Sequence, residues 1–348
     1  MGPPPGKRRR ARRRLALAVI AAAAALAGVL LGLGGGSSRS PTGPRGAQRA
    51  RHALSPGAPA VFAIHALPSP LPAPVQDAAA VALGGGRMAL LGGLDSSDTS
   101  TASITLLDGG RPAGEARLPV AQHDAQGVLL DGGAYVFGGG QVSSYDHILR
   151  FDPATGTVSQ AGRLPQPASD VAVAGVAGTA YVIGGYNGQQ GLDTILAWRP
   201  GGRPVLAARL PFALRYAAAA AVGGRIVIAG GSQGEDAAQE ILSFDPSTGR
   251  VEQIGRLPSP LTHASAVALG AYVYVLGGRG ASAGSQTSAI VAIEPTRGTA
   301  VRVGQLPYAL SDAAVGVLGG RIVLAGGQGA SGTKSSILEL EPRPAAGR

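Results

Sequence analysis

The sequence predicts an all-β protein, a six-bladed β-propeller of four-stranded blades, preceded by an N-terminal transmembrane or signal helix. Glycine pairs recur at steps of 46, 46, 46, 47 and 49 residues, and a period of this size indicates a repeat architecture. Short β-branched, aromatic and aliphatic runs precede the pairs and favour strands over helices. A Leu-Pro dipeptide recurs with the same period, as expected at strand ends. The pairs are Gly92-Gly93, Gly138-Gly139, Gly184-Gly185, Gly230-Gly231, Gly277-Gly278 and Gly326-Gly327.

The third repeat shows the content of one unit. Four short strands are expected at residues 170–176, 179–183, 194–199 and 204–209. Gly178 and Pro200-Gly201-Gly202 lie at the first and last turns, and a polar loop follows Gly184-Gly185. Four short antiparallel strands make one propeller blade.

The chain resembles kelch-repeat β-propellers over roughly residues 60–342. The shared residues are the apolar strand that ends in Gly-Gly and turns such as Phe151-Asp152-Pro153 and Phe244-Asp245-Pro246. Kelch blades usually carry a Trp early in the fourth strand. Val158, Val205 and Val251 take that place here, and the single tryptophan, Trp198, lies in a third strand. The resemblance therefore implies packing between blades through smaller aliphatic side chains.

The last repeat lacks a fourth strand. It supplies strands at residues 313–318, 321–325 and 335–340, and the chain then nearly ends. An unassigned run, Val61 to Leu67, has the same six-residue spacing as Val158 to Leu164. We expect it to complete the sixth blade, because an open sheet edge invites aggregation. The alternative is a linker that contains a few apolar residues.

Composition excludes several classes of function. There is no cysteine, so disulfides, thiol catalysis and Cys-ligated metal sites are excluded, as is chemistry like that of kelch-fold copper oxidases that need a cysteine-modified tyrosine. The net charge is +10, but residues 1–51 hold eleven Lys and Arg and no acid, which leaves 19 basic and 20 acidic side chains. The high isoelectric point comes from residues 1–51, the leader, so we expect no nucleic-acid binding by the propeller.

The leader predicts membrane attachment or export. A basic cluster from Lys7 to Arg14 precedes an uncharged run, Leu15 to Leu33, long enough as a helix to cross a bilayer at about 1.5 Å per residue. The cluster should stay cytoplasmic and place the propeller outside the cell membrane. The alternative is a cleaved signal with Ala25-Leu26-Ala27 at the cleavage site. The predicted segments are 1–14 (basic, cytoplasmic), 15–33 (transmembrane or signal-anchor), 34–59 (flexible linker), 60–342 (propeller) and 343–348 (tail).

Polar residues at one repeated position form the candidate site. The residue six beyond each Leu-Pro leucine should lie on the same face as the loop after Gly-Gly, and together these residues should ring one mouth of the central channel. They are Asp77 (placed by its spacing from Gly92), Asp124, Asp170, Tyr216, His263 and Asp312, with His123 and Arg215 as preceding neighbours. The loops add Asp95, Asp98, Tyr186, Asn187, Gln189, Glu235, Asp236 and Arg279.

Two interpretations of this ring remain open. Six equivalent Asp-like positions could fasten neighbouring blades. Alternatively, the ring is a polar cup for a cation, a sugar or a protein loop, which the departures Arg215, Tyr216 and His263 favour. Close carboxyls also favour a bound cation or a raised pKa. We assign no catalytic residue, metal ligand or cofactor.

These patterns predict a monomeric, membrane-tethered, extracytoplasmic binding module for a protein or carbohydrate ligand. The resemblance also implies an alternative, an exported carbohydrate-active enzyme similar to kelch-type mutarotases of sialic acid. A second alternative is a structural protein of the cell envelope. Fold alone does not decide between them.

Overall fold

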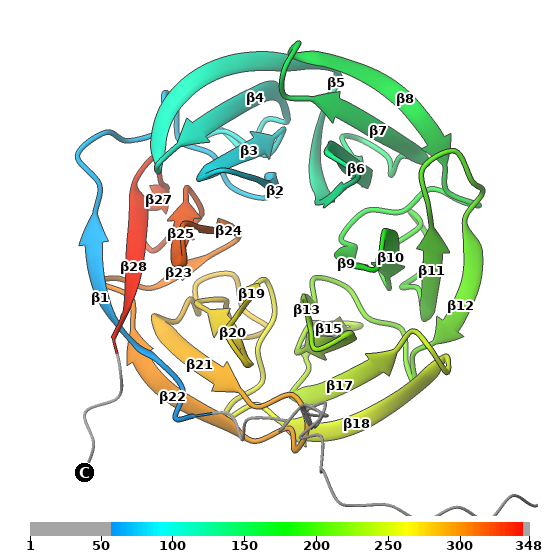
Figure 1. Ribbon diagram of the computed structural model, residues 1–348, viewed down its shortest axis with the longest axis vertical. Helices are drawn as coiled ribbons and strands as arrows, with labels where there is room; N and C mark the ends of the chain where they lie inside the picture. The colour runs from blue at the N-terminus through cyan, green and yellow to red at the C-terminus, as the bar shows by residue number, and fades with distance from the viewer. Residues whose placement is uncertain (1–56, 344–348) are drawn as a thin grey trace, which may run out of the picture. The chain divides into compact units, whose positions relative to one another are not determined.

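The computed structural model describes residues 57–343, which consist of antiparallel strands and loops without a helix. Their sheets stand radially around a central channel (Figure 1), and this is the arrangement of a β-propeller. The predicted basic segment, membrane helix and most of the linker lie outside the described residues. No helix within residues 57–343 is long and apolar enough to cross a bilayer.

The strands occupy four positions from the channel to the rim. Nearest the channel lie β2 (Ala79–Gly84), β9 (Ala172–Val176), β13 (Ala218–Val222), β19 (Ser265–Leu269) and β24 (Ala314–Leu318). Next come β3 (Arg87–Leu91), β6 (Gly133–Gly140), β10 (Thr179–Ile183), β14 (Arg225–Ala229), β20 (Tyr272–Leu276) and β25 (Arg321–Ala325). Third are β4 (Thr101–Asp108), β7 (His147–Asp152), β11 (Thr194–Trp198), β17 (Glu240–Asp245), β21 (Ala289–Ile293) and β28 (Ile337–Arg343). At the rim lie β1 (Val61–Ala66), β8 (Thr157–Arg163), β12 (Val205–Arg209), β18 (Arg250–Arg256) and β22 (Ala300–Gln305).

One long strand, β5 (Arg111–Leu130), belongs to two neighbouring sheets. Its first part pairs with β4 at the rim, and its second part pairs with β6 beside the channel. The two sheets therefore join into one of seven strands, while the others remain four-stranded. Short pairs extend the loops: β15 (Ser232–Gln233) with β16 (Asp236–Ala237), and β26 (Gln328–Gly329) with β23 (Leu310–Ser311) and β27 (Gly332–Thr333).

The first and last described strands pair with each other. β1 lies antiparallel to β28, from Val61 opposite Arg343 to Ala66 opposite Leu338. The resulting sheet has the order β1-β28-β25-β24. Phe62 packs edge-on against Tyr274 of the preceding sheet, with ring centroids 5.0 Å apart. The N-terminal strand thus occupies the rim position that the last repeat does not supply.

The hydrophobic core lies between neighbouring sheets rather than in the channel. Trp198 of β11 is buried against Tyr135 and Phe137 of β6 in the preceding sheet, at centroid distances of 5.0 and 5.4 Å. Val158 packs against the core as the resemblance implied. Val205 does not, because 60% of its surface is exposed at the rim. The buried indole takes the packing role that was expected of small aliphatic groups in this part of the ring.

The glycine pairs are contacts between sheets. Gly185 donates its N–H to the carbonyl of Leu214, just before the next inner strand, at 2.8 Å. Gly184 has φ +59°, and a Cβ there would overlap the same carbonyl oxygen. Glycine is required because the two backbones touch and because the left-handed region disfavours a side chain. The glycine pairs therefore recur with the period of the repeats because each pair lies where one sheet contacts the next.

Candidate functional site

The six predicted ring residues converge on one end of the central channel. Asp124 lies within β5, and the other five lie two residues before an inner strand. Each has φ between +50° and +59°. Asp tolerates this left-handed region better than most residues, whereas Tyr is rare there. The repeated Asp is thus partly a backbone requirement. Tyr216 and His263 hold the same conformation at a cost of about 1–3 kcal/mol each.

Backbone hydrogen bonds join the six residues into a closed ring. The N–H of each ring residue donates to the carbonyl of the preceding ring residue. The series runs from Asp124 to Asp77 at 3.2 Å round to Asp77 to Asp312 at 3.0 Å. The fastening role suggested by the sequence therefore falls to the main chain. The side chains face the channel. The backbone ring does not depend on them, so it does not explain which residue types occur there.

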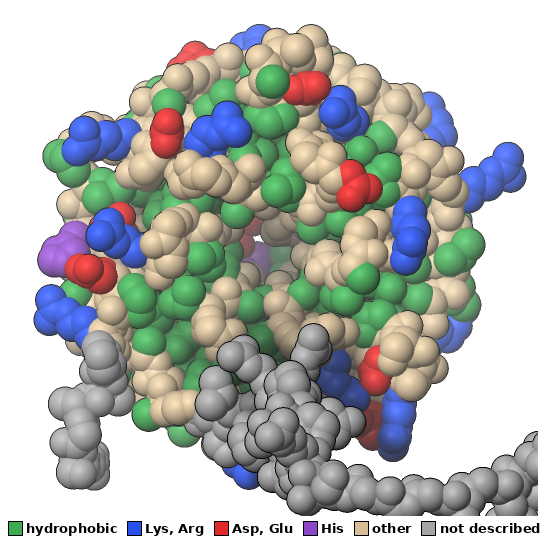
Figure 2. Space-filling view, viewed as in Figure 1, with side chains coloured by type: hydrophobic (Ala, Val, Ile, Leu, Met, Phe, Trp, Pro, Cys, Tyr) green, Lys and Arg blue, Asp and Glu red, His purple; other side chains and the backbone are tan. Residues whose placement is uncertain are grey.

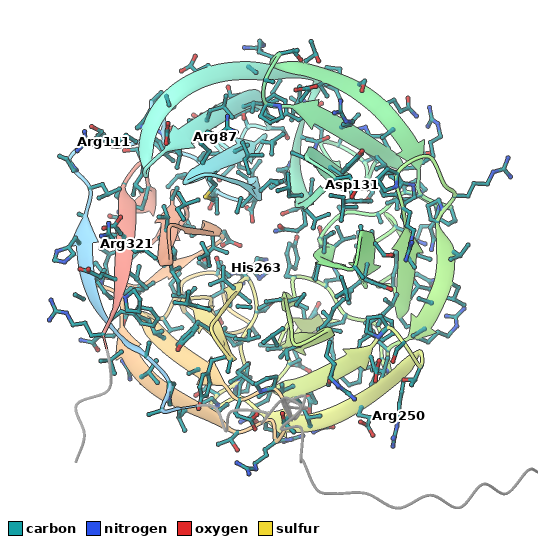
Figure 3. The ribbon with its side chains drawn as sticks, viewed as in Figure 1. Arg87, Arg111, Asp131, Arg250, His263 and Arg321 are labelled. Atoms are coloured by element: carbon teal, nitrogen blue, oxygen red, sulfur yellow. The ribbon has the colours of Figure 1, made fainter. Side chains whose placement is uncertain are left out.

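The side chains of this ring surround a cavity of about 190 Å³. Its deeper wall is made mainly of Ala residues from the inner strands, because six strands approach too closely for larger groups. The centre of the molecule is open in the space-filling view, with acidic and His side chains visible in its depth (Figure 2). His263 lies at the centre of the ring (Figure 3). The cavity thus combines a polar mouth with a small-residue wall.

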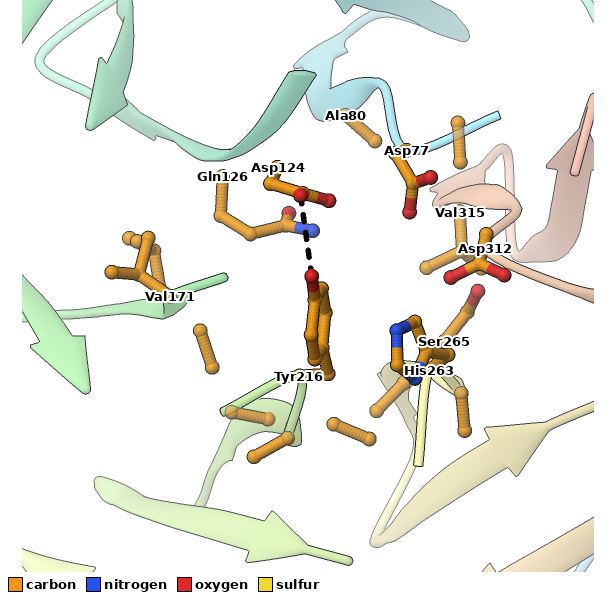
Figure 4. Close-up of a pocket in the computed structure, with 18 of the residues that line it drawn as sticks. Asp77, Ala80, Asp124, Gln126, Val171, Tyr216, His263, Ser265, Asp312 and Val315 are labelled. Atoms are coloured by element: carbon orange, nitrogen blue, oxygen red, sulfur yellow. Dashed lines mark hydrogen bonds between the residues drawn. The ribbon is translucent and has the colours of Figure 1, made fainter. Parts of the chain in front are cut away.

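Four carboxyl groups form two pairs in the cavity. Asp77 lies beside Asp312, and Asp124 lies beside Asp170 (Figure 4 labels all but Asp170). Burial raises the pKa of Asp77 and of Asp124 well above the usual carboxyl range, and the neighbouring carboxylates raise both further. Burial also raises the pKa of Asp312. Asp77, Asp124 and Asp312 therefore keep their protons to a higher pH than an ordinary carboxyl does.

The two preceding neighbours contact the ring from outside the cavity lining. Arg215 forms an ion pair with Asp170 at 2.5 Å, and its guanidinium lies 4.2 Å from the centroid of the Tyr186 ring. His123 lies 3.5 Å from Asp124 and hydrogen-bonds to Ser100 at 2.8 Å. Burial lowers the pKa of the His123 imidazole. Arg215 therefore compensates the charge of Asp170, whose side chain is only 2% exposed.

Tyr216 and His263 form a stacked aromatic pair. Their ring centroids are 3.7 Å apart at an interplanar angle of 23°. The Tyr216 hydroxyl donates to Asp124 at 3.3 Å, and burial together with the nearby carboxylates raises the pKa of this phenol. Burial, then Arg279 and Arg215, lowers the pKa of His263 to about 3. Both aromatic side chains are therefore neutral over the physiological range of pH.

The hydrogen bonds of His263 leave neither ring nitrogen free. Arg279 Nη2 lies 3.0 Å from Nε2, and a guanidinium only donates, so Nε2 accepts. Nδ1–H then donates to the Thr262 hydroxyl at 3.0 Å, and Thr262 lies 2.8 Å from Ser232. An imidazole with both nitrogens occupied serves as a flat surface rather than as a proton acceptor.

Sequence reasoning missed two polar groups of the cavity. Gln126 and Ser265 lie two residues beyond their ring residues, where the other repeats have Ala79, Ala172, Ala218 and Ala314. Ser265 donates to the Ala313 carbonyl at 2.6 Å, whereas Gln126 is exposed and its amide lies among the ring side chains (Figure 4). An alignment of the repeats against one another would have exposed both departures.

The described residues do not offer a metal centre. Within 57–343, no three or more His, Asp or Glu side chains are placed to hold a metal ion. The carboxyls of the ring are arranged as two separated pairs, one of them tied to Arg215. The ring therefore suits hydrogen bonding to a polar group better than coordination of a metal.

The fold is shared with a solved structure. The chain is similar to YjhT, with a TM-score of 0.67 at 15% identity, over 79% of this chain and 98% of that chain. At this identity the likeness shows the fold alone. No protein-family model matches the chain, and the comparison with curated proteins gave no match.

Proposed function

We propose that this protein is a six-bladed, kelch-type propeller that binds a small, hydroxyl-rich ligand at the Asp-ringed mouth of its channel. The observation that carries the proposal is the division of labour in the ring. Backbone hydrogen bonds close the circle, and the ring side chains, which are not needed for those bonds, converge on one cavity. Such a concave polar site with perturbed carboxyls is the default binding hypothesis.

The chemistry of the mouth favours a sugar ring or one polar side chain of a protein loop. Protonated carboxyls donate hydrogen bonds, and the carboxyl oxygens of Asp170, which lie against the Arg215 guanidinium, accept them. The Tyr216–His263 pair adds a neutral aromatic surface, which suits the apolar face of a sugar. The small volume, about 190 Å³, fits one such group rather than an oligosaccharide.

Calorimetric titration with a panel of neutral monosaccharides tests this proposal. We expect saturable binding of at least one sugar, and loss of that binding in the double variant Tyr216→Phe with His263→Asn. Both replacements keep the size of the side chains. Arg87→Ala and Arg111→Ala, at hairpin turns away from the ring (Figure 3), serve as controls and should bind normally. Equal affinity in the double variant would place the site elsewhere.

A second candidate function, an enzyme acting on carbohydrate, is favoured by the carboxyl pairs. Carboxyls with raised pKa can act as general acids near neutral pH, and Asp124 already holds the Tyr216 hydroxyl. The occupied nitrogens of His263 count against a histidine base. Proton NMR of a bound sugar would distinguish the two, because an enzyme accelerates exchange between its anomers or consumes it.

We also propose that residues 15–33 tether the propeller to the outer face of the cell membrane. The basis is the basic cluster directly before an uncharged run of 19 residues. The chain has no cysteine, so Ser38→Cys provides a single reporter. It should react with a membrane-impermeant maleimide on intact cells. Labelling only after lysis would refute the orientation, and a mature N-terminus near Gly28 would indicate a cleaved signal.

A further inference from the structure

The connection that precedes Asp77 carries two Leu-Pro dipeptides, Leu67-Pro68 and Leu71-Pro72. Leu71 precedes Asp77 by six residues, as Leu164 precedes Asp170. Leu71 and Val75 donate to the carbonyls of Ser335 and Lys334 of the last sheet. The connection therefore runs along its sheet as in the other repeats, and the four additional residues, 67–70, lie upstream of it.

The same place in the ring holds an arginine without the acidic partner of its counterparts. The arginine before Leu-Pro is ion-paired in three repeats: Arg163 with Asp146 at 2.7 Å, Arg209 with Asp193 at 2.6 Å and Arg256 with Glu240 at 2.7 Å. Arg117 is the equivalent residue, and Ser103 stands opposite it. Within residues 57–343, Arg117 has no carboxylate within ion-pair distance.

This arginine borders a cavity of about 280 Å³. Pro72 and Pro74 of the connection form one wall, and β4 and β5 form the other with Thr101, Thr105, Glu115 and Arg117. Glu115 and Arg117 are two residues apart on one face of β5, and both are exposed. The Thr101 hydroxyl is buried beside the cavity without a hydrogen-bond partner, a state that costs about 1–3 kcal/mol.

We propose that this cavity binds a small zwitterion, an α-amino acid with an apolar side chain. Its carboxylate would pair with Arg117, as an acidic side chain pairs with the equivalent arginine in three other repeats. Its ammonium would pair with Glu115. The apolar side chain would lie against Pro72 and Pro74. Two acids, Glu115 and Asp95, and one arginine in the lining disfavour a simple anion, because it would meet net negative charge.

The test is calorimetry on the purified full-length protein with L-valine, L-leucine and L-proline as probes. We expect at least one to bind saturably. The matching amino-acid amide, which lacks the carboxylate, and the N-acetyl derivative, which lacks the ammonium, should each bind at least tenfold more weakly. Arg117→Gln should lower the affinity for the free amino acid at least tenfold. Arg163→Gln, at the equivalent position of the next repeat, should leave that affinity unchanged.

A second variant restores the pattern of the other repeats. Ser103→Asp places an acid opposite Arg117, as Glu240 lies opposite Arg256, and should abolish binding without lowering the unfolding temperature, since Ser103 is exposed. The ring variant Tyr216→Phe with His263→Asn should bind the amino acid normally, so failure at either site is distinguishable. No saturable binding of any probe, or unchanged affinity in Arg117→Gln or Ser103→Asp, would overturn the proposal.

Discussion

The mouth of the channel and the cavity beside Arg117 arise in opposite ways. At the mouth, all six repeats place the same backbone conformation at the same position, and the site comes from their convergence. Beside Arg117, one repeat departs from the others through the missing acid opposite the arginine. The first region is therefore tied to the integrity of the ring. The second can change with little effect on folding.

The largest expected effect is at the contacts that close the ring. Gly184→Ala should lower the free energy of unfolding by about 2–5 kcal/mol, because a Cβ overlaps the Leu214 carbonyl and φ is positive. Gly178→Ala is the matched control, since its φ is +73° but the space around it is open; it should cost about 1–2 kcal/mol. Urea unfolding measures both, and equal losses would show that backbone strain alone matters.

Substitutions of two equivalent residues at the mouth should have opposite effects on the free energy of unfolding. Asp170→Asn leaves the Arg215 guanidinium without its ion pair and should cost about 1–3 kcal/mol. Asp77→Asn should instead stabilise the protein at pH 7.5, because it removes a carboxyl whose ionisation is disfavoured by burial. The folded-state pKa of Asp77 is raised, so ionisation opposes folding above the unfolded-state pKa.

The benefit of Asp77→Asn should accordingly disappear as the pH falls towards about 4, where the unfolded-state carboxyl is protonated as well. Thermal unfolding at pH 7.5 and pH 4.5 checks this. A stabilisation that persists unchanged at the lower pH would mean that the pair of carboxyls does not hold its proton as the structure indicates.

The pKa of His263 is lowered, whereas that of Asp77 is raised, so His263 should make the protein less stable as the pH falls. Its folded-state pKa is lowered to about 3, so the unfolded chain takes up a proton below about pH 6.5 while the folded protein does not. Between pH 7 and pH 5 the wild type should lose about 2 kcal/mol of stability relative to His263→Asn. Urea unfolding of both proteins at the two pH values measures the difference. A constant difference would indicate that the imidazole is exposed.

The smallest expected effect is at the exposed arginines. Arg163→Gln removes an exposed ion pair and should cost about 0.2–1 kcal/mol. Arg117→Gln removes no ion pair within the described residues and should be neutral in stability. The contrast with its proposed effect on amino-acid binding separates a ligand contact from a structural one. A clear loss of stability in Arg117→Gln would show that the arginine holds the fold.

Much of the architecture could be predicted from the sequence because the repeat period is a local property that tertiary packing must respect. The spacing of Val61 to Leu67 matched that of complete repeats, and β1 lies beside β28. The offset of six residues from Leu-Pro located five ring residues, and the spacing from Gly92 located Asp77. All six line one cavity. The role of Val205 was predicted wrongly, because Val205 pairs with Ala197 and so lies on the opposite side of the sheet from Trp198, where it is exposed at the rim.

By itself, the sequence determined the period and order of the repeats, the absence of cysteine and the positions that face one another around the channel. Only the tertiary structure decided what those positions do. The closed ring of backbone hydrogen bonds, the pairing of carboxyls and the occupied nitrogens of His263 join residues from different repeats. Such contacts depend on distances between sheets, which a linear pattern does not encode, and burial then sets the charge of each group.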